Sequence, residues 1–97
     1  MTAQALDRRG AAGIVEEALA AVFEPAVVRQ LREDSPLGML GMAPADAVCV
    51  SDAVAQAAAA AGLECRLGDA DLGGAATVAD LVSAVQGAAR RTDEEHE

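Results

Sequence analysis

The stretch Leu40-Gly41-Met42-Ala43-Pro44-Ala45-Asp46 predicts where a long loop ends and the next helix begins. Proline suits the first position of a helix, because its backbone angle is already helical and it lacks an amide that would have no partner there. Ala43 is a poor N-cap, since it has no side-chain oxygen to accept the free amides of the first turn. We therefore expect a helix over residues 44–61, which Gly62 ends.

An earlier helix is predicted from about Ala11 onward. Apolar residues recur there at every fourth position, as they do on one face of an α-helix. These residues are Ile14, Ala18 and Val22. The pair Glu24-Pro25 ends this helix, because the residue before a proline is driven out of the helical conformation. Pro25 can also open a short helical turn over residues 26–31.

Shorter elements follow the helix over 44–61. The alternating segment 63–67 is interpreted as an extended loop with its apolar residues turned inward, because a single strand would have no partner. Residues 69–72 are expected to form one helical turn. Thr77 is a good N-cap, and Asp80 follows it at the spacing of a capping box. The spacing of Val78, Leu81, Val82 and Val85 then indicates an amphipathic helix.

These elements together predict an all-α fold, namely a small four-helix bundle with a long first loop. Within that loop, Leu37, Met39 and Leu40 are expected to insert into the bundle. Val48 is expected to widen the apolar stripe of the helix over 44–61, and the core is expected to be small because alanine dominates the apolar residues. We divide the chain into a flexible N-terminus at 1–10, a helical domain at 11–91 and a disordered acidic tail at 92–97.

Charge narrows the choice of partner. The net charge is −9, and all seven basic residues are arginines that form no long stripe. Nucleic acid is excluded as a partner, because phosphate binding requires clustered Lys or Arg. Basic or apolar protein surfaces are favoured instead. Because the chain has two cysteines, no apolar secretory segment and no stretch that predicts a membrane span, we expect a cytoplasmic protein without membrane contact.

The stretch 40–46 resembles the signature Leu-Gly-x-Asp-Ser-Leu-Asp of the acyl and peptidyl carrier proteins. Three further matches occur in the order of that family. Asp46-Ala47-Val48 is similar to its Asp-x-Val, Gly62-Leu63-Glu64-Cys65 to its Gly-Ile-Glu-Ile, and residues 77–82 to its Thr-Val-x-Asp-Leu-Val. The resemblance covers roughly residues 11–87 and implies a carrier-protein-like four-helix bundle.

The same resemblance shows what this chain has lost. Carrier proteins attach a 4′-phosphopantetheine arm to the Ser of the signature, and the matching position here is Pro44, which has no hydroxyl. The flanking Asp and Leu, which cap the helix and help partner enzymes dock, are Ala43 and Ala45. The segment 44–63 is also about one helical turn longer than is usual for the family. The resemblance therefore implies a carrier fold without a cofactor.

Two residues are candidates for a displaced attachment site. Ser51 has a hydroxyl, but it lies inside the expected helix and would more simply be an exposed helical serine. Cys49 is expected where carrier proteins place a residue that faces a partner, and its thiol is an alternative attachment atom. Cys65 replaces an apolar core residue of the family pattern and is interpreted as a small hydrophobe. A working carrier with its arm on Ser51 or Cys49 thus remains an alternative.

We expect no enzymatic activity and no metal site, because neither a Ser-His-Asp set nor metal-ligand spacing is present. The predicted function is that of a degenerate carrier-like domain that binds an enzyme or assembly of polyketide, fatty-acid or nonribosomal-peptide biosynthesis. The expected contact residues are Met42, Ala45, Asp46, Cys49 and Asp52. An unrelated helical adaptor is a further alternative, and the small side chains of the helix over 44–61 are compatible with a homodimer.

Overall fold

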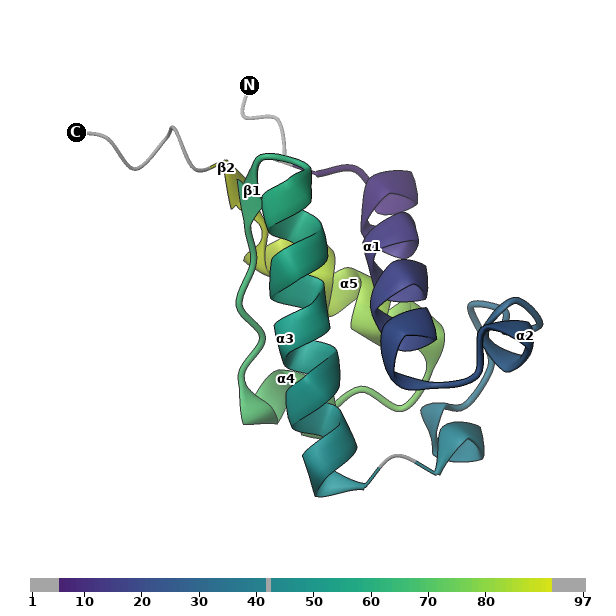
Figure 1. The fold of residues 1–97 in the computed structure, drawn as a ribbon. Coiled ribbons are helices and arrows are strands. Elements are labelled where there is room, and N and C mark those ends of the chain that lie inside the picture. Colours follow the sequence, from purple (N-terminus) through teal and green to yellow (C-terminus); the bar gives the residue numbers. More distant parts are fainter. Residues whose placement is uncertain (1–5, 42, 92–97) are drawn as a thin grey trace.

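Three long helices form the body of the molecule (Figure 1). In this computed structural model, which describes residues 6–41 and 43–91, they are α1 (Arg8–Val22), α3 (Pro44–Ala60) and α5 (Val78–Ala88). Helix α1 packs against both α3 and α5. The remaining elements are α2 (Pro25–Val28), the 3-10 helix η1 (Leu37–Leu40), α4 (Asp69–Gly73) and the two-residue strands β1 (Leu63–Glu64) and β2 (Arg90–Arg91). The described residues are mostly helical, as the predicted all-α fold requires, but they also contain the short strand pair β1 and β2.

Helix α1 begins at Arg8, three residues before the predicted start at Ala11. Asp7 is its N-cap, and the Asp7 carboxylate accepts a hydrogen bond of 2.7 Å from the backbone N–H of Gly10. Such a cap satisfies one of the free amides of the first turn. Residues 8–10, which the sequence pattern assigns to a flexible lead-in, are therefore the first turn of α1. Residues 1–5 and the predicted tail at 92–97 lie outside the described residues.

The core is made of small aliphatic side chains. Its largest fully buried members are Leu19, Leu81, Val15, Val50, Val54, Val82, Val85 and Cys65. Phe23, the one aromatic residue of the chain, is only half-buried at its edge. The predicted small core is therefore correct. Because its members are small, each buried leucine supplies a large share of the apolar area removed from water.

The segment 63–67 has a strand partner, contrary to our expectation. Leu63 and Glu64 pair antiparallel with Arg91 and Arg90, so β1 and β2 form a short sheet beside the end of α3. No sequence pattern indicates this pairing, because Arg90-Arg91 lacks the alternating apolar residues of a strand. The apolar side chains of the segment do turn inward as predicted: Leu63, Cys65 and Leu67 are all buried.

The long loop before α3 is held against the start of α5 by backbone hydrogen bonds. The N–H groups of Val78 and Ala79 donate to the carbonyls of Ser35 and Glu33, at 3.0 and 2.8 Å. In return, the Leu37 N–H donates to the Ala76 carbonyl at 2.9 Å. The first amides of a helix have no partner within that helix, so the loop supplies acceptors that α5 requires.

Arg8 adds side-chain contacts to the same junction. Its guanidinium donates to the Ser83 hydroxyl at 3.0 Å and to the Ala79 carbonyl at 3.3 Å. It also lies 3.4 Å from the carboxylate of Glu33. Both charged side chains are largely exposed, so the ion pair itself stabilises the fold only slightly. Its main effect is to connect the first turn of α1 with the loop and with α5.

Two expectations about the interior are wrong. Met39 is 68% exposed and Val48 is 58% exposed, whereas both are predicted to be part of the core. Leu37 is buried, and the half-buried Leu40 packs against the core, as expected. Since η1 is a tight 3-10 turn, it directs Leu37 inward and Met39 outward.

The start of α5 has the predicted capping box. Thr77 accepts a hydrogen bond from the Asp80 N–H at 3.3 Å, and the Asp80 carboxylate accepts from the N–H groups of Ala76 and Thr77 at 3.0 and 3.2 Å. These two backbone donors hold the pKa of Asp80 below its usual value of 3.8. The charged carboxylate is therefore the form that the fold favours.

A pH-dependent stability difference follows for the variant Asp80→Asn. Because the pKa of Asp80 is lowered on folding, its contribution to stability is present above pH 3.8 and is lost as the pH falls through the lowered value. We expect the wild type to be more stable than the variant at pH 7, and the difference to shrink progressively below about pH 4. Urea unfolding of both proteins across pH 3–7 measures this. An unchanged difference at pH 3 would contradict the assignment.

Candidate functional site

The start of α3 forms one wall of an open apolar pocket. Helix η1 and the loop after it form a second wall, and α4 with the segment that follows it forms a third. The volume of this apolar pocket is about 620 Å³. Its main lining side chains are Leu37, Pro44, Ala47, Val48, Leu72 and Ala75. The start of α3 lies at the end of the molecule opposite to β1 and β2 (Figure 1).

Small residues account for the shape of the apolar pocket. Gly38, Gly41 and Gly73 contribute backbone without side chains to its lining. Gly41 ends η1 with a φ of 63°, a left-handed conformation that glycine adopts without strain. A β-carbon added at Gly38 or Gly73 would meet no atom within 4 Å, so these positions border open space.

Pro44 is the first residue of α3, as predicted. Ala43 precedes it in an extended conformation and provides no side-chain cap. Asp46 compensates in part, because its carboxylate accepts a hydrogen bond of 3.0 Å from the backbone N–H of Ala43. This is the half of a capping box that does not require an oxygen at the N-cap. Asp46, which is predicted to contact a partner, therefore has a structural role at the helix start.

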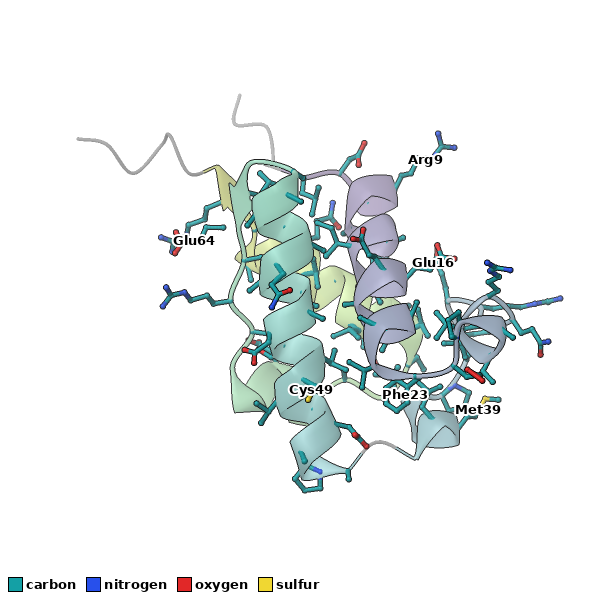
Figure 2. The ribbon with its side chains drawn as sticks, in the orientation of Figure 1. Arg9, Glu16, Phe23, Met39, Cys49 and Glu64 are labelled. Atoms are coloured by element: carbon teal, nitrogen blue, oxygen red, sulfur yellow. The ribbon has the colours of Figure 1, made fainter. Side chains whose placement is uncertain are left out.

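The other predicted contact residues on α3 form one exposed row. Ala45, Cys49 and Asp52 follow one another at i, i+4 and i+7, and all three are exposed. Figure 2 shows Cys49 on the near face of α3, in its lower half. We call these three residues the outer ridge. Asp46 does not belong to it, and Met42 lies outside the described residues.

Val48 and Ala47 are site residues that the sequence analysis missed. Val48 is predicted to be in the core, but it lines the apolar pocket together with Ala47 and Pro44. A signal for this face is present in the sequence, since Pro44, Ala47, Val48 and Ser51 follow the i, i+3, i+4, i+7 spacing of a helix face. The contributions of α4 and η1 carry no such signal, because they depend on how the loops fold back onto α3.

Ser51 is not the exposed serine that we expected. It is half-buried, and its hydroxyl donates a hydrogen bond of 3.1 Å to the carbonyl of Leu67. This bond ties the segment after β1 to the middle of α3. A group attached to the Ser51 oxygen would remove that bond and would have to emerge between packed elements.

The two cysteines have opposite environments. Cys49 is exposed on the outer ridge, whereas Cys65 is 1% exposed, with its sulfur 3.7 Å from the carbonyl of Val85. Burial raises the pKa of the Cys65 thiol, and the charge of Asp71 raises this pKa further. The Cys65 thiol is therefore held in its neutral, unreactive form at neutral pH.

Alkylation is expected to separate the two thiols. In the folded protein at about pH 7.5, iodoacetamide should modify Cys49 at least roughly tenfold faster than Cys65, because the thiolate is the reacting species and Cys65 is both buried and neutral. Peptide mass mapping over a time course measures the two rates. In urea the rates should become similar. Equal rates in the folded protein would contradict the burial of Cys65.

Two other kinds of feature were sought among the described residues, namely a metal site and a membrane-spanning helix. Among them, no group of three His, Cys, Asp or Glu side chains is arranged to hold a metal ion. No helix in the described ranges is both long enough and apolar enough to cross a bilayer. We base the proposed function on the apolar pocket and the adjacent outer ridge, because they surround the start of α3, where the sequence predicts the contact residues. Comparisons of the chain with protein-family models, with curated proteins and with solved structures found no match.

Proposed function

We propose that this chain is a carrier-protein-like four-helix domain that lacks the attachment serine and acts as a protein-interaction partner in polyketide, fatty-acid or nonribosomal-peptide biosynthesis. The observation that carries the proposal is the position of Pro44. It is the first residue of α3 and follows the long loop three residues after Gly41, which ends η1.

Other features of the fold support the same proposal. In the carrier pattern, α1, α3, α4 and α5 would be the four helices. Thr77 caps α5, and residues 77–82 resemble the family's Thr-Val-x-Asp-Leu-Val sequence. The extra turn between Pro44 and Leu63 is accommodated by α3 itself, which continues without a break to Ala60. Gly62 then turns the chain with a φ of 80°.

The function proposed for this surface is docking, because its first residue cannot hold an arm. Proline has neither a hydroxyl nor an amide N–H. The outer ridge and the apolar pocket are accessible beside it, so both are available to a protein partner. The domain would then serve as a scaffold, a regulator or a mimic of a true carrier.

The first test of this proposal is the mass of the intact protein. The chain is co-expressed with a broad-specificity phosphopantetheinyl transferase, with an authentic carrier protein as the positive control. We expect no added mass on this chain and complete modification of the control. A mass increase of one phosphopantetheine group would favour the alternative of a displaced site, and peptide mapping would then assign it to Ser51 or Cys49. The half-buried Ser51 hydroxyl makes Cys49 the more accessible of the two.

The second test addresses the partner. An excess of this domain is added to a purified ketosynthase that uses an authentic acyl carrier as its substrate. A mimic of the carrier should slow the reaction by competing for the docking surface, and the variant Asp52→Lys on the outer ridge should compete less well. Gln30→Lys, which introduces a lysine at an exposed position on another part of the chain, serves as the matched control. If the domain neither binds the ketosynthase nor slows its reaction with the authentic carrier, the proposed role in biosynthesis is wrong.

A further inference from the structure

A second pocket lies between α1, α2, the loop after α2 and the start of α5. It shares no lining residue with the apolar pocket, and its volume is about 160 Å³. Its floor consists of four buried side chains of the core, namely Val15, Leu19, Val28 and Val82. Its apolar sides consist of three half-buried residues, Ala12, Leu31 and Val78. We call this feature the small pocket.

The mouth of the small pocket is charged. Its exposed lining residues are Glu16, Arg32 and Glu33. Figure 2 shows Glu16 on the side of α1 that is turned toward α2, and the other two residues belong to the loop after α2. The carboxylate of Glu33 is paired with the guanidinium of Arg8 at 3.4 Å. The mouth therefore offers a ligand one carboxylate, that of Glu16, and one guanidinium, that of Arg32.

Size limits the apolar part of a ligand for the small pocket. An apolar cavity of about 150 Å³ lined by Leu, Ile and Phe holds one benzene molecule. The small pocket has a similar volume and an aliphatic floor, so it accepts one branched aliphatic or aromatic group. A long acyl chain is too large for it. Removing such a group from water is the main favourable contribution to binding.

Charge limits the polar part of the ligand. A zwitterion complements the mouth, because its ammonium group pairs with Glu16 and its carboxylate pairs with Arg32. A ligand with only an ammonium group leaves Arg32 without a counter-charge, and one with only a carboxylate is repelled by Glu16. A second copy of the chain would bring another net charge of −9 and is disfavoured by repulsion. An α-amino acid carries both charges and an apolar side chain on a single carbon.

We propose that the small pocket binds a free α-amino acid whose side chain is apolar and of the size of leucine or phenylalanine. The ligand side chain fills the space above Val15, Val28 and Val82, and its two charged groups remain at the mouth. The ligand would contact α1, the loop after α2 and α5 at once. This binding goes beyond the proposed function and is independent of it, because no residue of α3 lines the small pocket.

An NMR titration of the ¹⁵N-labelled chain tests the proposal. The probes are L-leucine and L-phenylalanine at up to about 10 mM, since ligands with so few atoms bind weakly. We expect saturable shifts of the amides in the middle of α1, in residues 28–33 and at the start of α5. L-alanine, which lacks a large side chain, should bind at least roughly tenfold more weakly. 2-Phenylethylamine and 3-phenylpropionate each lack one charge and should bind about two- to fivefold more weakly than phenylalanine, because exposed ion pairs are weak.

One variant fills the apolar part of the small pocket. Ala12→Leu adds a larger side chain at a lining position, so the side chain of the ligand stays in water. Binding of phenylalanine should weaken by roughly tenfold or more. Ala21→Leu is the matched control, because residue 21 is exposed on the same helix and does not line the small pocket. It should leave binding unchanged, and circular dichroism confirms that both variants are folded.

Two further variants each remove one charge from the mouth. Glu16→Gln and Arg32→Gln should each weaken the binding of phenylalanine by about two- to fivefold. Glu16→Gln should not weaken the binding of 3-phenylpropionate, which has no ammonium group. Arg32→Gln should likewise not weaken the binding of 2-phenylethylamine, which has no carboxylate. The matched controls are Glu17→Gln and Arg29→Gln, at exposed positions that do not line the small pocket.

Four outcomes would overturn the proposal. The first is the absence of saturable shifts at about 10 mM ligand. The second is a set of shifted amides elsewhere in the fold, and the third is undiminished binding to Ala12→Leu. The fourth is equal affinity for phenylalanine and its singly charged analogues, because the small pocket would then recognise only an apolar group. None of these results affects the intact-mass and ketosynthase measurements, which test the proposed function separately.

Discussion

The variant Ala43→Asp/Pro44→Ser/Ala45→Leu is expected to accept phosphopantetheine from a broad-specificity transferase, whereas the wild type accepts none. Residue 44 is exposed and is the first residue of α3, so a serine there would present its hydroxyl to solvent at the start of the helix. The carboxylate introduced at residue 43 would cap the free amides of the first turn and stabilise α3 by about 0.5–2 kcal/mol. The expected change is from no modification to a readily detected fraction of the protein, measured by intact mass.

A matched variant isolates the contribution of the hydroxyl. Ala43→Asp/Pro44→Ala/Ala45→Leu has the same cap and the same leucine but no oxygen at residue 44, and it should remain unmodified. Circular dichroism shows whether the serine variant is folded. If it is folded and gains no mass while an authentic carrier does, the transferase does not recognise the surface around α3 as that of a carrier protein. The resemblance of the stretch 40–46 would then have no functional meaning.

The variant Leu81→Ala is expected to lower the free energy of unfolding by about 2–5 kcal/mol. Leu81 is 0% exposed and is one of the two leucines among the largest fully buried side chains. The other core residues are mostly valines and alanines, which are too small to fill the resulting cavity. Because small domains have total stabilities of about 5–15 kcal/mol, this single change should remove a large share of the stability of the fold. Urea denaturation followed by circular dichroism measures the loss.

Val27→Ala is the control for this effect. Val27 is 44% exposed on α2, so its truncation leaves no closed cavity and should change stability by less than about 0.5 kcal/mol. A loss below about 1 kcal/mol for Leu81→Ala would show that α5 is not packed against α1 through a closed core.

Local chemistry predicts the helices well. Pro44 as the start of α3, Thr77 as the cap of α5 and Gly62 as the stop after α3 each depend on residues within one turn of the position concerned. The predicted start of α1 is wrong because it rests on apolar spacing alone and leaves out Asp7, although Asp is a favourable N-cap. Helix starts and stops of this kind can be predicted from neighbouring residues without knowledge of the rest of the fold.

The features that could not be predicted from the sequence depend on contacts between residues far apart in the chain. The partner of β1 is Arg90-Arg91, whose composition does not favour a strand. Val48 is apolar, but whether it faces the core or an open pocket depends on where α4 comes to lie. Ser51 has an acceptor only because the segment around Leu67 passes beside α3. The outer ridge is predictable as one exposed helix face, whereas the apolar pocket requires three segments to be placed together.

The backbone bonds between the loop and the start of α5 have a consequence for the dynamics of the domain. The amides of Leu37, Val78 and Ala79 donate across this junction, although residues 37 and 78 are far apart in the chain. Such amides exchange with solvent hydrogen only when the junction opens, so the three should exchange together and more slowly than those of a free loop. Opening the loop would also displace Leu37, which lines the apolar pocket, and would remove acceptors from α5. The docking surface and the last helix therefore belong to one cooperative unit, and an occupant of the pocket would slow hydrogen exchange in a helix that it does not touch.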